Sequence, residues 1–260
     1  MRNLGHGQTS VEQHVLLVRE DLRKMITQGK LNMGIAELDQ AIRDLHLQQF
    51  DLNYVAGNYA ACAKALAYVG DSPKAYERFV YLYAHAPGYR DEKALQRVVE
   101  ELGNDNPHAV TAMALSACEP GSAIDPDDVH RLAQKILEPR DLEYASHSDA
   151  YLLLCCGKLA LAKQDFDRAL EYFDKGDKAY PQGSYSFRRA ELHLCRADAF
   201  ESLGDLWKAL QASGRALVAA HEQVRLESDN PQWARLERKA TERRAELEIK
   251  NFQSMQIPER

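Results

Sequence analysis

One short phrase occurs three times in the chain, at residues 70–75, 164–169 and 204–209. Each copy has a short turn, then an Asp able to cap the next helix, and then a basic residue followed by Ala. Aligning the copies on that Ala places a small residue twelve positions earlier in each: Ala63, Gly157 and Ala197. A small residue midway along one helix lets a second helix approach it closely. The phrase therefore predicts pairs of antiparallel helices, which must stack to bury their apolar faces.

At these residues the chain resembles the tetratricopeptide repeat (TPR) family. The best match, 151–181, has Leu153, Gly157, Ala169, Phe173 and Pro181 in the family's pattern. The match at 57–87 has Tyr59, Ala63, Leu66, Ala75, Phe79 and Pro87. A third unit at about 190–223 keeps Ala197, Phe200, Ala209 and Ala216 but loses the second-helix aromatic residue and the proline, and 11–46 is a degenerate fourth pair. The resemblance implies an all-α fold, an α-solenoid of antiparallel helix pairs forming a TPR-like superhelix.

Apolar periodicity and capping residues predict the helices directly. After a first helix that begins near Val11, we expect helices at about 31–47, 52–69, 72–86, 91–102, 107–118, 126–138, 149–163, 166–179, 186–203, 205–226 and 231–254. The middle third matches the repeat poorly, and is either two degenerate pairs or a hinge. The expected organisation is a flexible N-terminus at 1–9, N-terminal repeats at 10–118, C-terminal repeats at 119–228 and a charged helix with its tail at 229–260.

The last expected helix differs from the others in composition. It carries ten charged residues between Trp233 and Lys250, with a thin apolar stripe. One interpretation is a capping helix with one face on the last repeat. The alternative is a connector that pairs in a coiled coil, forms a homodimer and passes a signal on. Arg243 and Arg244 interrupt the heptad and weigh against the alternative.

The usual catalytic constellations are absent from the sequence. It lacks a P-loop, a His-Glu-x-x-His motif and a Gly-x-Ser-x-Gly motif, and no two of its nine His stand four apart on a helix. The run 125–128 is explained as a capped helix start with Pro at its first position, rather than a weak divalent-cation site. The five Cys are interpreted as reduced core residues, although the adjacent Cys155 and Cys156 leave a redox or thiol–metal site as the alternative. The sequence predicts no enzyme, no metal and no cofactor.

Charge and hydropathy narrow the class of partner. The chain has 33 basic and 39 acidic residues, a formal net charge of −6, which argues against a nucleic-acid partner. The N-terminus has no apolar signal region, and the longest apolar run, 151–162, is too short to span a bilayer. We therefore expect a cytoplasmic protein with no membrane association.

The TPR resemblance also implies a surface, because the first helices of the pairs line the concave face in that family. The groove residues it implies are Lys64, Tyr68, Tyr151, Leu154, Lys158, Leu161, Glu191 and Asp198. For Leu154 and for Leu194 the alternative is burial between repeats. Chaperone adaptors of the family place an Asn clamp on these helices where this chain has Lys64, Lys158 and Asp198, so that ligand class is disfavoured.

The expected function is a non-catalytic scaffold that holds a protein or peptide segment of mixed charge in this groove. The alternative is a regulatory or sensory TPR domain of a bacterial signalling protein. Such a domain would sense a peptide or oligomerise, and would relay the signal through the C-terminal helix.

Overall fold

The structure is a computed structural model that describes residues 35–139, 146–180, 187–226 and 231–256. Within these ranges the regular elements are helices, and no strand occurs. The predicted all-α class is confirmed. The helix expected to begin near Val11 lies outside the described residues.

The chain divides into two compact units, residues 1–82 and 83–260, which are described separately. The first contains α2 (Ile35–Val55), α3 (Tyr59–Val69) and most of α4 (Pro73–His85). Leu47, Val69 and Ala75, one from each helix, form its buried cluster. The Arg78 guanidinium of α4 lies 2.8 Å from the Asp51 carboxylate of α2. The predicted domain boundary at 118–119 falls inside the second unit and stays a prediction.

The predicted division of this first unit into helices at 31–47 and 52–69 is wrong. One helix, α2, continues through 48–51, where the sequence has no helix breaker and Phe50 is buried. The break comes instead at Gly57, which adopts a φ of 70°, and at Asn58, whose side chain accepts a hydrogen bond from the Ala61 backbone at 3.3 Å. A positive φ favours glycine, and Asn is a preferred helix cap.

Helix ends in the second unit lie within two residues of the predicted ones. The helices are α5 (Glu92–Leu102), α6 (Pro107–Ala117), α7 (Pro126–Leu137), α8 (His147–Ala162), α9 (Phe166–Ala179), α10 (Phe187–Ser202), α11 (Leu206–Leu226) and α12 (Pro231–Gln256), after a 3₁₀ turn at Pro87–Tyr89. Local capping explains this agreement. Asp91, Asn106, Asp125 and Asp165 each accept a backbone hydrogen bond at the start of a helix.

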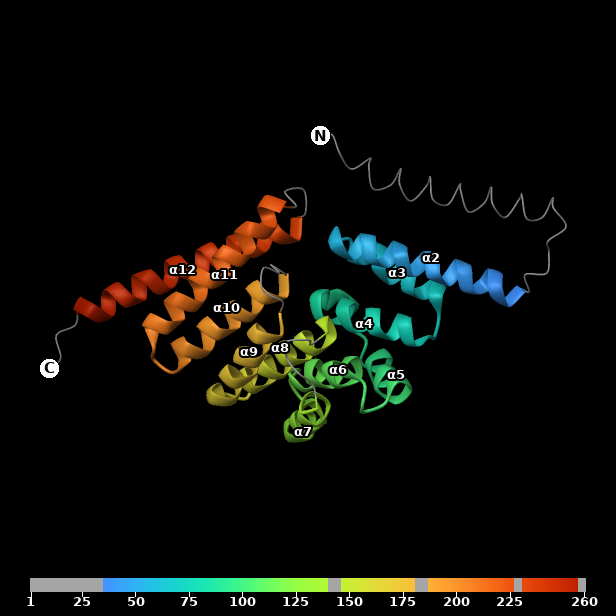
Figure 1. The fold of residues 1–260 in the computed structure, drawn as a ribbon, viewed down its shortest axis with the longest axis horizontal. Helices are drawn as coiled ribbons and strands as arrows, with labels where there is room; N and C mark the ends of the chain where they lie inside the picture. The colour runs from blue at the N-terminus through green and yellow to red at the C-terminus, as the bar shows by residue number, and fades with distance from the viewer. Residues whose placement is uncertain (1–34, 140–145, 181–186, 227–230, 257–260) are drawn as a thin grey trace. The chain divides into compact units, whose positions relative to one another are not determined.

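The packing of the second unit follows a regular order (Figure 1). From α5 to α12 each helix packs against the next one in the chain. In addition, α6 packs on α8, α8 on α10 and α10 on α12, so these four form one row. Each of α7, α9 and α11 packs against two successive members of that row. In the middle third, α6 and α7 follow the same order as the pairs α8–α9 and α10–α11.

Helices α8 and α9 approach closely at Gly157, the small residue that the alignment identified. A Cβ atom added at Gly157 of α8 would lie 2.3 Å from Cε1 of Phe173 in α9, a ring that is fully buried. A Cβ at Gly176 of α9 would lie 2.7 Å from Cδ1 of Leu192 in α10. Glycine therefore sets the spacing of α8, α9 and α10.

One face of α12 packs on the preceding helices. Leu236 and Ala240 join a buried cluster with residues of α10 and α11, and Leu247 joins a second. This packing agrees with the capping interpretation. Away from it, Phe252 is 61% exposed, and Ile249 is similarly exposed. No described helix is both long enough and apolar enough to cross a membrane.

We predict opposite effects for two Gly→Ala substitutions in helix interiors. Gly157→Ala overpacks against the fixed ring of Phe173 and should destabilise the unit by about 2 kcal/mol or more. Gly214→Ala, where an added Cβ meets only Arg244 Nη1 at 3.6 Å, should stabilise it by about 0.5–1 kcal/mol through helix propensity. Urea and thermal unfolding check both. Stabilisation by Gly157→Ala would contradict the close approach.

Candidate binding face on helices α8, α10 and α12

The predicted groove residues fall in both units. Lys64 and Tyr68 are exposed on α3 in the first unit, with Tyr68 at 62%. The other six lie on α8 and α10, which belong to the packed row of the second unit. The site is therefore built from the second unit.

Two of these six residues are part of the core. Leu154 is fully buried, in line with the packing alternative, and Leu194, for which the same alternative was considered, is buried as well. Tyr151 is 1% exposed, because its ring is covered by the Arg188 guanidinium at 3.6 Å from the ring centroid and stacks with the His85 ring. Neither Tyr151 nor Leu154 offers surface to a ligand in this conformation. The accessible part of the predicted groove is Lys158, Leu161, Glu191 and Asp198, all of which are half-buried.

Lys158 of α8 and Glu191 of α10 form an ion pair across the row. The second oxygen of Glu191, Oε2, lies 3.9 Å from Nε2 of His85. Burial opposes ionisation of Glu191, but the charge of Lys158 and the contact with His85 outweigh it and hold the pKa of Glu191 below its usual value. Burial likewise opposes the charged form of Lys158, and Glu191 outweighs it and raises the pKa of Lys158. Both groups are charged at neutral pH.

A second ionic cluster joins α10 to α12. The Arg243 guanidinium lies 2.7 Å from Asp198 and also pairs with Glu201, which is further paired with Lys250. Hydrogen bonds from Lys250 and Arg243 keep the pKa of Glu201 below its ordinary value. The Asp198 side chain remains 49% exposed, whereas that of Arg243 is 17% exposed. Asp198, which the sequence analysis had placed in the groove, is therefore an accessible charge of this cluster.

Sequence reasoning missed three residues of this face: His85, Arg188 and Arg243. Arg243 had been noted only as an interruption of the heptad. Two sequence features could have indicated its contacts: an arginine pair interrupts the apolar stripe of α12, and acidic residues stand near the end of α10. For His85 and Arg188 no local pattern indicates the contact, because Tyr151 lies far from both in sequence.

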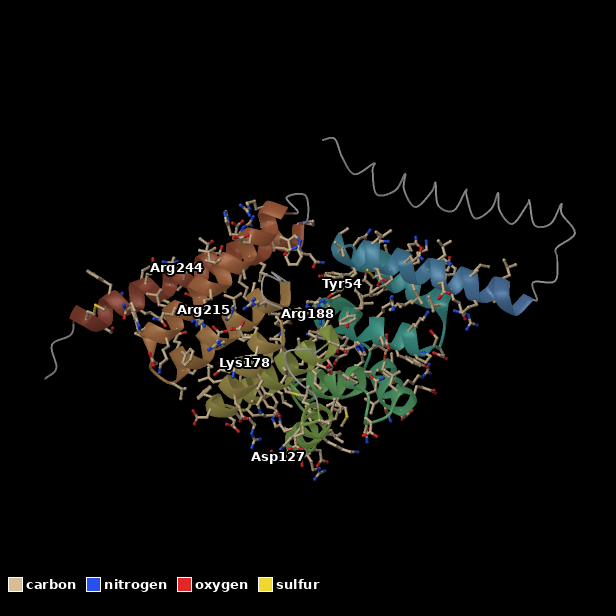
Figure 2. The ribbon with its side chains drawn as sticks, in the orientation of Figure 1. Tyr54, Asp127, Lys178, Arg188, Arg215 and Arg244 are labelled. Atoms are coloured by element: carbon tan, nitrogen blue, oxygen red, sulfur yellow. The ribbon has the colours of Figure 1, made fainter. Side chains whose placement is uncertain are left out.

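The side of α10 that faces α9 holds a buried histidine. His193 is 4% exposed, and its Nε2 lies 3.4 Å from Asp177, which also accepts a hydrogen bond from Arg189 at 2.9 Å. Burial, with Arg196 and Arg215 nearby, lowers the pKa of His193 to about 4 despite the opposing charge of Asp177 (Arg215 is labelled in Figure 2). His193 is therefore neutral in the folded protein at neutral pH.

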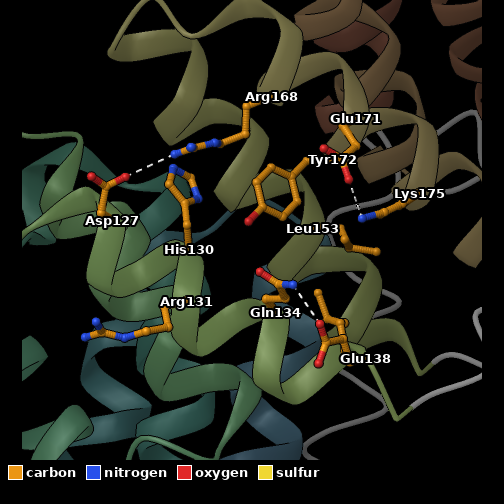
Figure 3. Close-up of a pocket in the computed structure, with 11 residues that line it drawn as sticks. Asp127, His130, Arg131, Gln134, Glu138, Leu153, Arg168, Glu171, Tyr172 and Lys175 are labelled. Carbon is orange, nitrogen blue, oxygen red and sulfur yellow. Dashed lines mark hydrogen bonds and ion pairs between the residues drawn. The ribbon is translucent and has the colours of Figure 1, made fainter.

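A hollow of about 680 Å³ lies between α7 and α9, with Leu153 of α8 in its lining (Figure 3). His130 stacks on Tyr172 within it, at 5.3 Å between ring centroids. The charged and polar side chains are paired with one another: Arg168 with Asp127, Lys175 with Glu171 and Gln134 with Glu138. Three acids and three bases line the hollow, so its formal charge does not select an anion or a cation.

The buried cysteines and the acidic run show neither a reactive thiol nor a metal site among the described residues. Burial raises the pKa of Cys155 to about 12, so its thiol is protonated at neutral pH, and the neighbouring Cys156 is buried too. Among the described residues no three His, Cys, Asp or Glu side chains come together as metal ligands. In the run at 125–128, Asp125 caps α7 by accepting from the Asp127 backbone at 3.0 Å, and Asp128 pairs with Arg131.

The chain is similar in structure to a solved protein at low sequence identity. No family model and no curated protein matches the chain. Among solved structures, a point mutant of MamA aligns over 98% of its own chain and 70% of this one, with 18% sequence identity and a TM-score of 0.42. A TM-score below 0.5 does not establish a shared fold.

We predict that His193 makes stability pH-dependent. Its pKa is about 6.5 in an unfolded chain and about 4 in the folded one, so the unfolded state binds the proton first. The contribution is fully present above pH 6.5 and is lost as the pH falls toward 4, by on the order of 1–3 kcal/mol. Unfolding in urea across this range should show a shallower decline for His193→Gln. His221→Gln, at an exposed position, is the control and should show the same decline in unfolding free energy with falling pH as the wild type. An equal decline in the wild type and in His193→Gln would refute the assignment.

Proposed function

We propose that the chain is a TPR-like helical repeat protein that binds a segment of a protein partner along the row of α8, α10 and α12, without catalysis. The observation that carries the proposal is the row itself. The first helices of successive pairs pack on one another while α7, α9 and α11 lie against them. This is the order expected when helix pairs stack into a solenoid, and stacked pairs create extended binding surfaces. We further propose a cytoplasmic location, in which the five thiols stay reduced.

The accessible charges of the row suggest the chemistry of the partner segment. Near the end of α10, Asp198 is half-exposed, and it shares Arg243 with Glu201. Leu161, at the end of α8, is half-buried and offers apolar surface. A segment that places a Lys or Arg at Asp198 and an apolar side chain near Leu161 would match both features. The Lys158–Glu191 pair links α8 to α10.

The proposal predicts that reversing one charge on the row weakens partner binding. A partner is first captured from the native host, and its binding segment is synthesised as a peptide. Asp198→Lys should lower the affinity of the peptide about tenfold or more by calorimetry, because like charges then meet at the surface. Glu171→Lys, which makes the same change on the exposed side of α9, is the matched control and should change affinity less than twofold. Equal losses in both variants, or none in Asp198→Lys, would refute the assignment of the row.

The regulatory alternative is favoured by one specific contact. Arg243 fastens α12 to Asp198 and Glu201, the same carboxylates that a basic ligand would engage. A ligand cation would therefore compete with Arg243. Binding would then loosen α12, which leads to the end of the described chain. In this second candidate function the chain senses a segment and transmits the event through α12.

Hydrogen exchange distinguishes the two functions. If α12 relays, the bound peptide should increase amide exchange across 231–256 in the wild type, since the Arg243 contacts are given up. Arg243→Met, which has already lost these contacts, should bind the peptide but show no further increase. Unchanged or slower exchange in the wild type on binding would leave the simple scaffold as the function.

A further inference from the structure

A hollow of about 690 Å³ lies between α5, α6 and the segment that follows α6. None of α8, α10 and α12, the helices of the proposed binding row, contributes to its lining, so it is a separate surface. Its volume falls within the range of roughly 300–1,000 Å³ typical of ligand sites.

The floor of the hollow is apolar. Leu95 of α5 and Ala112 of α6 are buried beneath it, while Val99, Met113 and Ile124 are half-buried within it. The half-buried side chains keep apolar area in contact with water. Covering that area would be favourable, at roughly 25 cal/mol for each Å² removed from water.

The charges of the lining all have one sign. Glu92, Glu100 and Glu119 line the hollow, and no Lys, Arg or His is among its described lining residues. Arg90 pairs with Glu119 and compensates that carboxylate. Glu92 and Glu100 form no ion pair with any described basic side chain. Two negative charges therefore remain beside the apolar floor.

The carboxylate of Glu92 is held in place by neutral donors. The Tyr83 hydroxyl donates to one oxygen, and the Ser116 hydroxyl donates to the other at 3.1 Å. Glu100 accepts a hydrogen bond from Gln96 at 2.9 Å. These bonds orient the two carboxylates without cancelling their charge. A cation that reaches them would gain charge-assisted hydrogen bonds at little ordering cost.

The spacing on α5 suggests the pattern of the ligand. Glu92 and Glu100 are eight residues apart, which is about 12 Å along a helix, and Leu95 and Val99 stand between them on the same face. Along this face of α5 an acidic residue is thus followed by two apolar residues and a second acidic residue. A helix lying along it would be complementary if it carried basic residues about two turns apart with apolar residues between them.

We propose that this acidic–apolar hollow, formed by α5, α6 and residues 119–124, binds a basic amphipathic helix of a partner protein. It is a second docking surface, and it does not depend on the proposed role of the α8–α10–α12 row.

Two designed peptides of about four helical turns test the proposal on the full chain. Both carry Leu on one face; the first has Lys at the remaining positions, and the second has Glu there. By fluorescence anisotropy the Leu/Lys peptide should bind and the Leu/Glu peptide should not. Glu100→Lys should weaken the Leu/Lys peptide about tenfold, and Met113→Gln should weaken it as well by making the floor polar.

Matched variants distinguish binding in this hollow from non-specific electrostatic attraction of the peptide to the chain, and from binding at the proposed row. Glu171→Lys carries the same charge change as Glu100→Lys on an exposed position of α9, and should leave the affinity nearly unchanged. Asp198→Lys should also leave it unchanged, so that failure of the row and failure of the hollow remain distinguishable. Equal binding of both peptides, equal losses in Glu100→Lys and Glu171→Lys, or no loss in either hollow variant would overturn the proposal. Self-association of the chain that Glu100→Lys abolishes, without peptide binding, would assign the hollow to a second copy instead.

Discussion

The distance between neighbouring helices is the constraint on which the second unit depends, and two glycines set it. Gly157 admits the ring of Phe173 against the backbone of α8, and Gly176 admits Leu192 against α9. Since α9 then lies close to both α8 and α10, α10 is brought alongside α8. At this separation Lys158 of α8 forms an ion pair with Glu191 of α10. The ionic contacts of the binding face therefore follow from apolar packing, and they add orientation to a spacing already fixed.

Local chemistry explains how much of the fold the sequence predicts. Helix starts in the second unit are recognisable because a single Asp or Asn side chain caps the backbone a few residues later, as Asp91 and Asn106 do. The error in the first unit has the opposite origin. The interval 48–51 contains no helix breaker, and burial of Phe50 favours continuing the helix. The true break uses the Gly57–Asn58 pair, which the helix expected at 52–69 had enclosed.

The candidate binding face is predicted less well than the fold. Helical spacing shows which residues share one face of a helix, but not which residues of other helices they contact. Tyr151 and Leu154 share the face of Lys158, as expected, yet His85 and Arg188 cover Tyr151, and Leu154 lies in the core. These partners come from other helices, and no local pattern encodes such contacts. For the same reason the sequence did not predict the role of Arg243, because its ion pairs are made with carboxylates of another helix, α10.

The two surfaces of the second unit differ in how their charges are balanced, and this difference governs what each can do. On the proposed row, Glu191 and Glu201 are already paired with Lys158, Arg243 and Lys250, so a ligand would have to displace an internal cation. Such an exchange would gain little affinity but would move α12, as the proposed sensory function requires. In the α5–α6 hollow, the donors to Glu92 among the described residues are hydroxyl groups, so an incoming cation would not have to displace another cation. That surface is suited to steady attachment, and a chain with both could remain docked through one while responding through the other.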